Sequence, residues 1–195
     1  MTGHRADVTN ILIVGVGGQG ILFSAGILAQ LLVEKVFDVK EAEVHGMAQR
    51  GGSVHSMIRF GKEVHSPLIY EGEVDFLVSF EALEALRWAP FARPEAKIIV
   101  AGQRIDPLPV ALGLEKYPVD IEKKLKKTFR EVKFVDALDL AKKAGDVRAA
   151  NIVMLGALVK NFPFSQKRWL EVIEQRVPPK ILGVNRRAFE LGWKS

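Results

Sequence analysis

Ile11-Leu12-Ile13-Val14-Gly15-Val16-Gly17-Gly18-Gln19-Gly20 has the pattern of a β-strand that runs directly into a glycine-rich turn. The apolar run predicts a strand buried on both faces of a parallel sheet. Gly15, Gly17 and Gly20 fit G-x-G-x-x-G, a turn at which a phosphate can approach bare backbone at a helix N-terminus. An equally good interpretation is a tight turn that lets the helix pack closely on the sheet and holds no ligand.

The segments after this turn predict a departure from an ordinary dinucleotide-binding fold. A helix over residues 21–36 and a strand over 38–44 lead into a second glycine-rich loop, His45-Gly46-Met47-Ala48-Gln49-Arg50-Gly51-Gly52-Ser53. A strand over 54–60 follows. Gly61-Lys62 then has the composition of a two-residue hairpin turn, with a return strand over 63–66. An inserted β-hairpin makes the predicted sheet mixed rather than purely parallel.

The remainder of the chain continues the alternation and then becomes helical. Asp120, Asp146 and Ser165 are placed to cap helices. We expect strands over 74–80, 97–101 and 132–135, an irregular connection over 102–118, and helices over 81–88, 121–130, 136–144, 147–160, 166–175 and 181–193. The predicted fold is a three-layer, Rossmann-like α/β domain spanning 1–195, whose C-terminal helices, about 147–195, pack on it or on a partner.

Composition narrows the classes of function. The chain has 195 residues, 48% hydrophobic and 26% charged, which suits a folded domain rather than a disordered chain. It has no cysteine, so it predicts no disulfide and no cysteine-ligated iron–sulfur cluster. No apolar run is long enough for a membrane span, and the polar N-terminus lacks a signal-peptide core, so we expect a cytoplasmic location. The net charge of +5 comes without aromatic interleaving or a binding motif, and we expect no nucleic-acid partner.

The charged residues leave several interpretations open. Glu41 and Glu43 lie about 20 residues after the first turn, where a dinucleotide-binding fold holds a ribose, but on an alternating strand they also suit solvent-facing positions. The four histidines form no metal-binding signature, so no metal site is predicted. Arg50, in a loop of exposed amides, can clamp a phosphate or carboxylate, or pair with a surface glutamate or a partner chain.

Three segments together resemble a known family. They are Gly17-Gly18-Gln19-Gly20 after the buried strand, the run from Glu43 to Ser53 that contains HGMAQRGGS, and Asn151-Ile152-Val153-Met154-Leu155-Gly156-Ala157. They resemble the gamma-type subunits of 2-oxoacid:ferredoxin oxidoreductases, and within that family the beta subunits of the indolepyruvate enzymes. The HGMAQRGGS string is the specific part, because the first turn alone occurs in many folds.

The resemblance implies a subunit of a heteromeric enzyme that oxidatively decarboxylates an aryl 2-oxoacid, forms an acyl-CoA and reduces ferredoxin. In that family a large partner subunit carries thiamine diphosphate and the iron–sulfur clusters, so this chain alone is expected to bind no cofactor; isolated, it can form a homo-oligomer. Two glycine-rich loops at the carboxyl ends of adjacent strands would form one wall of the cleft over the thiamine and help to hold CoA or the substrate carboxylate. The residues expected there are Gly17, Gly18, Gln19, Gly20, His45, Gln49, Arg50, Gly51, Gly52 and Ser53.

Two other functions compete with this one. The first is a free-standing enzyme that binds an NAD-type nucleotide at the first turn, and the second is a purely structural subunit. The C-terminal aromatics Trp169, Phe189 and Trp193 either serve a partner interface or pack on their own domain.

Overall fold

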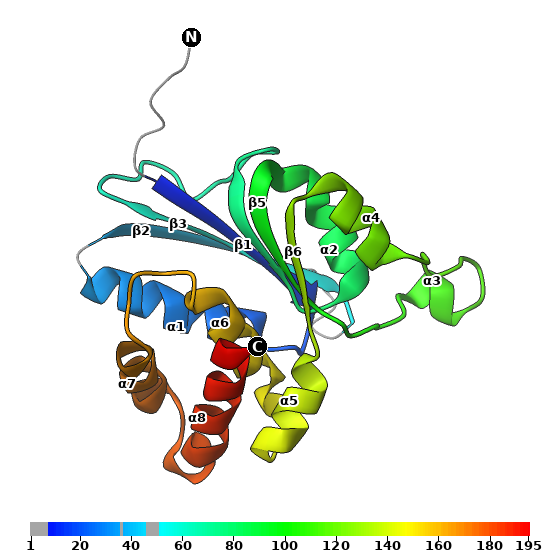
Figure 1. Cartoon of the computed structure of the whole chain (residues 1–195). Helices are drawn as coiled ribbons and strands as arrows, with labels where there is room; N and C mark the ends of the chain where they lie inside the picture. Colours follow the sequence, from blue (N-terminus) through cyan, green and yellow to red (C-terminus); the bar gives the residue numbers. More distant parts are fainter. Residues whose placement is uncertain (1–7, 36, 46–50) are drawn as a thin grey trace.

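One mixed sheet forms the centre of the molecule (Figure 1). The structure is a computed structural model that describes residues 8–35, 37–45 and 51–195. The strands are β1 (Val8–Val16), β2 (Asp38–His45), β3 (Ser53–Gly61), β4 (Val74–Ser79), β5 (Ala92–Ala101) and β6 (Glu131–Val135). They lie in the order β2-β3-β1-β4-β5-β6. β3 is antiparallel to β1 and β2, whereas β1, β4, β5 and β6 are parallel to one another, so the predicted mixed sheet is confirmed.

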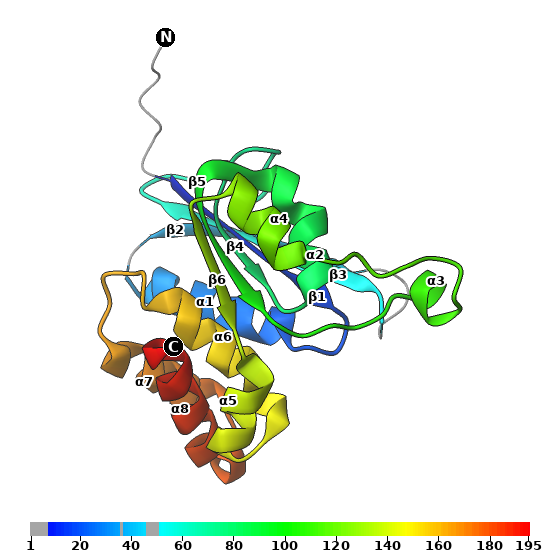
Figure 2. The ribbon, with the colours of Figure 1, turned by 45° about the vertical axis from the view of Figure 1, so that its right-hand side comes forward.

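Helices cover both faces of this sheet (Figure 2). They are α1 (Ile21–Glu34), α2 (Ala82–Trp88), α3 (Leu108–Ala111), α4 (Ile121–Thr128), α5 (Ala137–Ala144), α6 (Ala150–Val159), α7 (Gln166–Arg176) and α8 (Pro179–Lys194), with short 3-10 turns η1 (Ala89–Phe91) and η2 (Val147–Ala149). α1 and α5–α8 pack on one face, α2 and α4 on the other. The predicted three layers are confirmed. Within the described residues no helix is both long and apolar enough to span a membrane.

β1 lies in the middle of the sheet because its side chains are apolar on both faces. Ile11 and Ile13 pack into the core beneath α1, and Leu12 and Val14 into the core beneath α2 and α4. All four are at most 1% exposed. A strand without a polar face is stable only with a layer on each side, which is what the sequence predicts for this run.

The predicted hairpin is present in a different place. β3 does not turn back at Gly61-Lys62, and residues 63–66 form no strand, so that prediction is wrong. β3 is antiparallel to both of its neighbours. Asp38 of β2 lies opposite Gly61 of β3, and Val16 of β1 lies opposite Ser53 of β3. β3 is buried from Val54 to Ile58 on successive residues, so it needs a partner on each edge and a layer on each face, which a two-stranded ribbon over 54–66 cannot supply.

The three predicted N-cap residues lie at helix starts, but only one of them caps its helix with a side-chain hydrogen bond. The side chain of Asp146 accepts a hydrogen bond from the Arg148 amide, as a cap should. Asp120 and Ser165 stand at the predicted N-caps of α4 and α7, but their side chains make no capping hydrogen bond. Asp120 instead has φ 58°, a left-handed conformation. The connection after β5 is mostly irregular, as expected, with the short α3 inside it.

The C-terminal helices pack on the sheet through a close helix crossing. A Cβ at Gly156 would lie 2.5 Å from the Phe189 carbonyl oxygen, and one at Gly192 would lie 2.0 Å from the Val153 carbonyl oxygen. α6 and α8 can therefore approach backbone to backbone only with glycine at both positions. Trp169 and Phe189 are fully buried in this layer, and Trp193 packs against Phe189 at 5.9 Å between ring centroids. Of the two alternatives for these aromatics, packing on their own domain is the one found for Trp169 and Phe189.

Candidate functional site

The first glycine turn connects β1 to α1 through two residues in left-handed conformations. Gly18 has φ 102° and Gly20 has φ 80°, which L side chains rarely adopt. Gly20 is the N-cap of α1 and offers no side-chain cap, and the first turn of α1 carries no acidic residue. The first amides of α1 are therefore left to the surroundings, and the helix dipole adds partial positive charge there. This end of the sheet is suited to an anion.

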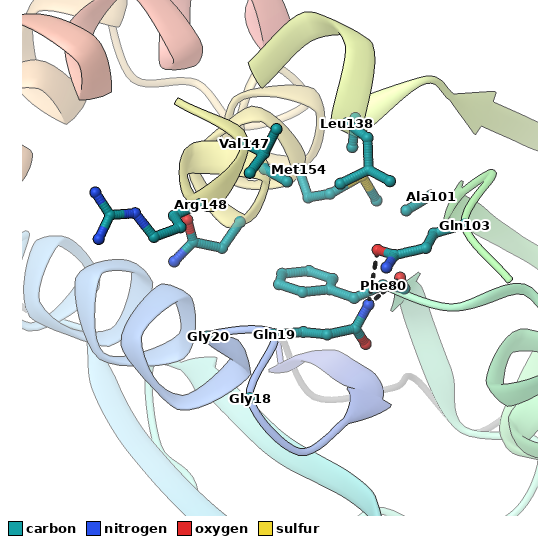
Figure 3. A pocket seen from close by; sticks show the side chains of 13 residues that line it. Gly18, Gln19, Gly20, Phe80, Ala101, Gln103, Leu138, Val147, Arg148 and Met154 are labelled. Carbon is teal, nitrogen blue, oxygen red and sulfur yellow. Dashed lines mark hydrogen bonds between the residues drawn. The ribbon is translucent and has the colours of Figure 1, made fainter. Parts of the chain in front are cut away.

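Gln19 fixes the shape of that turn. Its Oε1 accepts a hydrogen bond from the Val16 amide at 2.7 Å, and its Nε2 donates to the Phe80 carbonyl at 2.7 Å and to Gln103 Oε1 at 3.1 Å (Figure 3). The side chain thereby joins the carboxyl end of β1 to the residues that follow β4 and β5. A Cβ at Gly15 would lie 2.7 Å from Gln19 Oε1, which explains the small residue there. The Gln19 carboxamide is engaged with the protein itself.

The second glycine-rich loop ends directly beside the first. The Gly17 amide donates to the Gly52 carbonyl at 2.8 Å, and the Gly51 amide donates to the Gly17 carbonyl at 3.5 Å. Gly51 is left-handed, with φ 80°. The loops do not follow adjacent strands as we expected: β2 is one strand removed from β1, and it is the start of β3 that lies next to the turn. The antiparallel direction of β3 brings the two loops to one edge.

The structure places the predicted residues of the second loop unequally. His45 ends β2, whereas Gln49 and Arg50 lie outside the described residues. The Ser53 hydroxyl donates to Glu84 Oε2 at 2.6 Å. The described members Gly17, Gly18, Gln19, Gly20, Gly51, Gly52 and Ser53 thus meet at the carboxyl edge of β1 and the start of β3.

Two buried glutamates at the start of α2, its N-cap Glu81 and Glu84, were missed by the sequence analysis. Glu84 accepts from Ser53 and pairs with Arg87 Nη1 at 2.7 Å. Glu81 caps α2, because its Oε2 accepts from the Glu84 amide at 2.9 Å. Its Oε1 accepts from the Ile105 amide at 3.1 Å and the Tyr117 hydroxyl at 2.6 Å. Burial, and then the Glu81 carboxylate, raise the pKa of Tyr117 above its ordinary value. Two glutamates three apart, directly after a buried strand, were the available signal, since this spacing is typical of a capped helix start.

A cavity of about 420 Å³ opens between the first turn and the start of α6. Figure 3 shows Gln19, Phe80, Gln103 and Arg148 around it. Asn151 packs against the turn, since a Cβ at Gly20 would lie 2.5 Å from its Nδ2. A second cavity of about 420 Å³, lined by Gly17, Leu22, Phe23 and Val54 among others, lies along the turn. The turn is thus bordered by space for a ligand or a neighbouring chain.

Arg148 and Asn151 supply nitrogen atoms at the first cavity that the sequence analysis did not single out. Arg148 pairs with Asp146 at 2.6 Å and is mostly exposed. The Asn151 Oδ1 accepts from the Ile152 amide at 2.9 Å, and its Nδ2 makes no hydrogen bond within the described part of the chain. Both residues stand near the N-terminus of α6, whose first turn carries no acidic side chain. The N-terminus of α6 and the Asn151 amide favour negative charge on this side of the turn, whereas the Arg148 charge is balanced by Asp146.

The geometry does not reproduce a dinucleotide site. In the dinucleotide-binding order the second strand lies next to the first, and its terminal acid reaches the ribose. Here β3 separates β2 from β1, which moves Glu41 and Glu43 away from the glycine turn. Glu41 accepts from the Ser56 hydroxyl at 3.1 Å, and burial raises the pKa of Glu41. Across the described ranges, no cluster of three or more His, Cys, Asp or Glu could hold a metal ion.

Comparisons with known proteins agree over nearly the whole chain. A family described as pyruvate ferredoxin/flavodoxin oxidoreductase matches residues 10–195. The chain is 42% identical over 191 residues to indolepyruvate oxidoreductase subunit IorB of Thermococcus kodakarensis, with 95% of each chain covered. The fold matches pyruvate oxidoreductase subunit PORC of Thermotoga maritima with a TM-score of 0.74, 22% identity and 97% of each chain covered. It also matches a 2-oxoglutarate:ferredoxin oxidoreductase of Magnetococcus marinus, with a TM-score of 0.72, 19% identity, and 97% of this chain but 31% of that one covered.

Proposed function

Because the chain belongs to the pyruvate ferredoxin/flavodoxin oxidoreductase family and is a subunit of a 2-oxoacid:ferredoxin oxidoreductase, we propose that it forms one wall of that enzyme's substrate cleft. The wall closes over thiamine diphosphate held by a large partner subunit and helps to bind CoA or the carboxylate of the oxoacid. The substrate is an aryl 2-oxoacid such as indolepyruvate, which the names of the relatives support. Ferredoxin is reached through the assembled complex.

The observation that carries this proposal is the pair of hydrogen bonds between the two glycine-rich loops. Gly17 joins Gly52 and Gly51 at the carboxyl edge of β1. α1 then leaves toward one face of the sheet, whereas α2, after the neighbouring β4, packs on the other. Open α/β sheets hold their ligands in the crevice at such a point. Bare backbone from two loops supplies amides, and the N-terminus of α1 supplies a favourable field for an anion.

The lining of the first cavity supports CoA as one of the two anions held there. CoA is an anion with a long neutral arm, and the cavity of about 420 Å³ combines apolar walls with Arg148 and the Asn151 amide. The Magnetococcus marinus enzyme, whose fold includes this one, has CoA, 2-oxoglutarate and succinyl-CoA bound. The sequence has no cysteine for an iron–sulfur cluster, which supports a large subunit that carries the clusters; in this proposal the same subunit holds the thiamine.

In this arrangement the chain binds and orients, and the thiamine supplies the carbanion chemistry. Gly17, Gly18 and Gly20 offer backbone amides, with Gln19 holding their geometry, and Gly51 and Gly52 add the second loop. His45, Gln49 and Arg50 complete the wall, and Ser53 anchors its end on Glu84. Arg50 supplies the charge, since its planar guanidinium suits a phosphate or carboxylate.

A purely structural subunit is the second candidate. Gln19 and Ser53, two of the polar side chains expected at the site, are engaged with Phe80, Gln103 and Glu84 of the same chain. If the loops served only to pack against the large subunit, this is the arrangement that would result. The two functions differ in what the loops contribute to substrate binding.

Arg50 separates these candidates in the reconstituted complex. Loss of a charge-assisted hydrogen bond removes about 1.5–3 kcal/mol, so Arg50→Ala should raise the KM for CoA, or else for the oxoacid, by about ten- to a hundredfold. Arg50→Lys keeps the charge but loses the bidentate fork, and should recover only part of the loss. The constant that changes identifies the anion that is held.

Arg130→Ala provides the matched control, because Arg130 is an exposed arginine that precedes β6, at the other edge of the parallel strands. It should leave both constants within about twofold of the wild type. If Arg50→Ala assembles normally and also leaves both constants unchanged, the clamp is wrong and the structural role of the loop is preferred.

A further inference from the structure

Residues 105–119, which we call the arm, carry an unusual concentration of exposed apolar side chains. Leu108, Leu112, Leu114 and Val119 are 71%, 63%, 75% and 73% exposed, which makes them four of the five most exposed large apolar side chains among the described residues. Elsewhere the exposed apolar side chains are single, as at Val33, or form pairs, as at Leu22 with Phe23 and Leu68 with Tyr70. A cluster of this kind on a folded chain marks an interaction surface.

The tip of the arm, residues 107–114, holds its shape through its own backbone. Pro107 and Pro109 start α3 with fixed backbone angles, and Gly113, with φ 72°, ends it. The Leu114 and Glu115 amides both donate to the Pro109 carbonyl, at 2.9 and 3.2 Å. Figures 1 and 2 both show α3 in a loop that stands away from the sheet and the other helices. Its apolar tip is therefore ordered and presented outward.

A buried carboxylate fastens the base of the arm. Glu81 is 1% exposed, and its Oε1 accepts from the Ile105 amide at one end and the Tyr117 hydroxyl at the other. The Tyr117 oxygen also accepts from the Leu83 amide at 3.1 Å, and the Arg104 guanidinium lies 4.3 Å from the Tyr117 ring centroid. Because the base is set during folding, less ordering entropy is lost when the tip binds a partner.

The arm leaves the same edge of the sheet as the glycine loops. It follows the carboxyl end of β5, and Gln103, just before it, is bonded to Gln19 of the first turn. α2 holds both neighbours, with Glu81 at the base of the arm and Glu84 on Ser53. The glycine loops and the base of the arm therefore border the same edge of the sheet, where one partner can contact both. Residues 107–114 carry no charged side chain, so the complementary surface is an apolar groove.

We propose that the arm is a preformed docking element whose tip, Leu108, Leu112 and Leu114, inserts into an apolar groove of the large thiamine-carrying subunit. This inference rests on the proposed function, because the partner is the subunit assigned there. It places the subunit interface at the arm rather than at the C-terminal aromatics. The start of α2 then connects this interface to the glycine loops, because Glu81 holds the arm and Glu84 holds Ser53. Tyr117 is a positioning residue that acts through Glu81.

A competition experiment measures the contribution of the tip directly. Wild-type chain and the Leu112→Glu, Leu114→Glu variant are co-expressed with a limiting amount of the large subunit, and mass spectrometry gives their ratio in the purified complex and in the free pool. Because buried apolar anchors dominate interface energetics, the variant should be depleted from the complex by about 30-fold or more. The matched control is Val33→Glu, Leu68→Glu, at exposed positions elsewhere, and it should stay within about twofold.

Tyr117→Phe tests the fastening without changing the tip. It should raise hydrogen exchange over 105–119 and deplete the chain from the complex by about three- to tenfold, since only preorganisation is lost. Incorporation of the tip variant within twofold of wild type overturns the proposal. So does a tip variant that assembles normally but converts an isolated dimer into a monomer in sedimentation, which would assign the arm to a second copy of this chain. Incorporation into the complex is measured independently of KM. An Arg50 variant with unchanged KM values therefore does not affect the docking proposal, and normal incorporation of the tip variant does not affect the Arg50 clamp.

Discussion

Helices α6–α8, which we call the C-terminal flank, and the arm are both rich in apolar residues, but the flank buries them and the arm exposes them. In the flank, Trp169 and Phe189 are fully buried between α6, α7, α8 and the sheet. In the arm, Leu112 and Leu114 follow the short helix α3 and are exposed, on a segment that is fixed at its base. Apolar content alone therefore does not distinguish a core from an interface. What differs is whether another layer of the same chain is available to cover the residues.

Trp169→Ala should give the largest effect, a fall of about 3–5 kcal/mol in the free energy of unfolding, because it leaves a large cavity in the flank. Urea denaturation of the full chain measures it. Trp169→Phe is the matched control: the Trp169 Nε1 has no hydrogen-bond partner within the described residues, so losing it removes no bond, and the cost should be less than half. A cost below about 1 kcal/mol for the alanine variant would show that the flank is not a core.

Gly192→Ala tests the helix crossing that closes the flank. The new Cβ would lie 2.0 Å from the Val153 carbonyl oxygen, so α8 must move away from α6, and the free energy of unfolding should fall by about 1–3 kcal/mol. Gly183→Ala in the same helix is the control, because its Cβ would meet only Arg187 Nη1, at 3.6 Å. That change should stabilise the chain by up to about 1 kcal/mol through helix propensity. Equal effects of the two substitutions would contradict the close crossing.

Lys133 gives a weaker, pH-dependent effect at the edge of the flank. Lys133 and Lys160 both donate to the backbone oxygen of Ser195. Burial, and then Lys160, lower the pKa of Lys133 from 10.5 to about 8. Between these values the unfolded chain binds more protons than the folded one, so stability rises with pH from about 8 to 10.5. The difference in unfolding free energy between wild type and Lys133→Gln should show this rise, and a flat difference would contradict the shift.

Leu114→Ser in the arm should have the smallest effect on the isolated chain, within about 0.5 kcal/mol, since the side chain has no packing to lose. The same change should impair incorporation into the complex. Urea denaturation and the competition experiment therefore give opposite rankings for Trp169 and Leu114. A destabilisation above about 1 kcal/mol would mean that Leu114 is packed and that the contrast with the flank fails.

Local patterns were sufficient to predict most of the elements and the first turn. Residues 11–16 of β1 are apolar at every position, which is typical of a central strand, and the glycine-rich turn that follows contains two left-handed residues. Strand pairing was harder. Gly61-Lys62 has the chemistry of a tight turn, but the pairing of β3 is decided by burial on both its edges and faces, which is a property of the whole sheet.

In the candidate site, too, local features could be predicted and long-range contacts could not. The glycines could be predicted because backbone conformation restricts the residue type directly. The spacing of Glu81 and Glu84 indicates a capped helix start, but nothing in the order of residues shows that Tyr117 and Ser53 come back to meet them. The exposed leucines of the arm were hidden in a segment that its prolines marked only as irregular. Contacts between distant segments decide these assignments.

Glu81 Oε1 accepts hydrogen bonds from both ends of the arm, which makes the arm a modular segment. Closing a loop has an entropic cost that grows only slowly with its length, and here Glu81 Oε1 holds the closure at Ile105 and Tyr117, below the tip. The intervening residues can therefore be shortened, lengthened or exchanged for another peptide with little effect on the sheet. The protein offers a rigid, two-ended attachment point for grafting, placed beside its glycine loops.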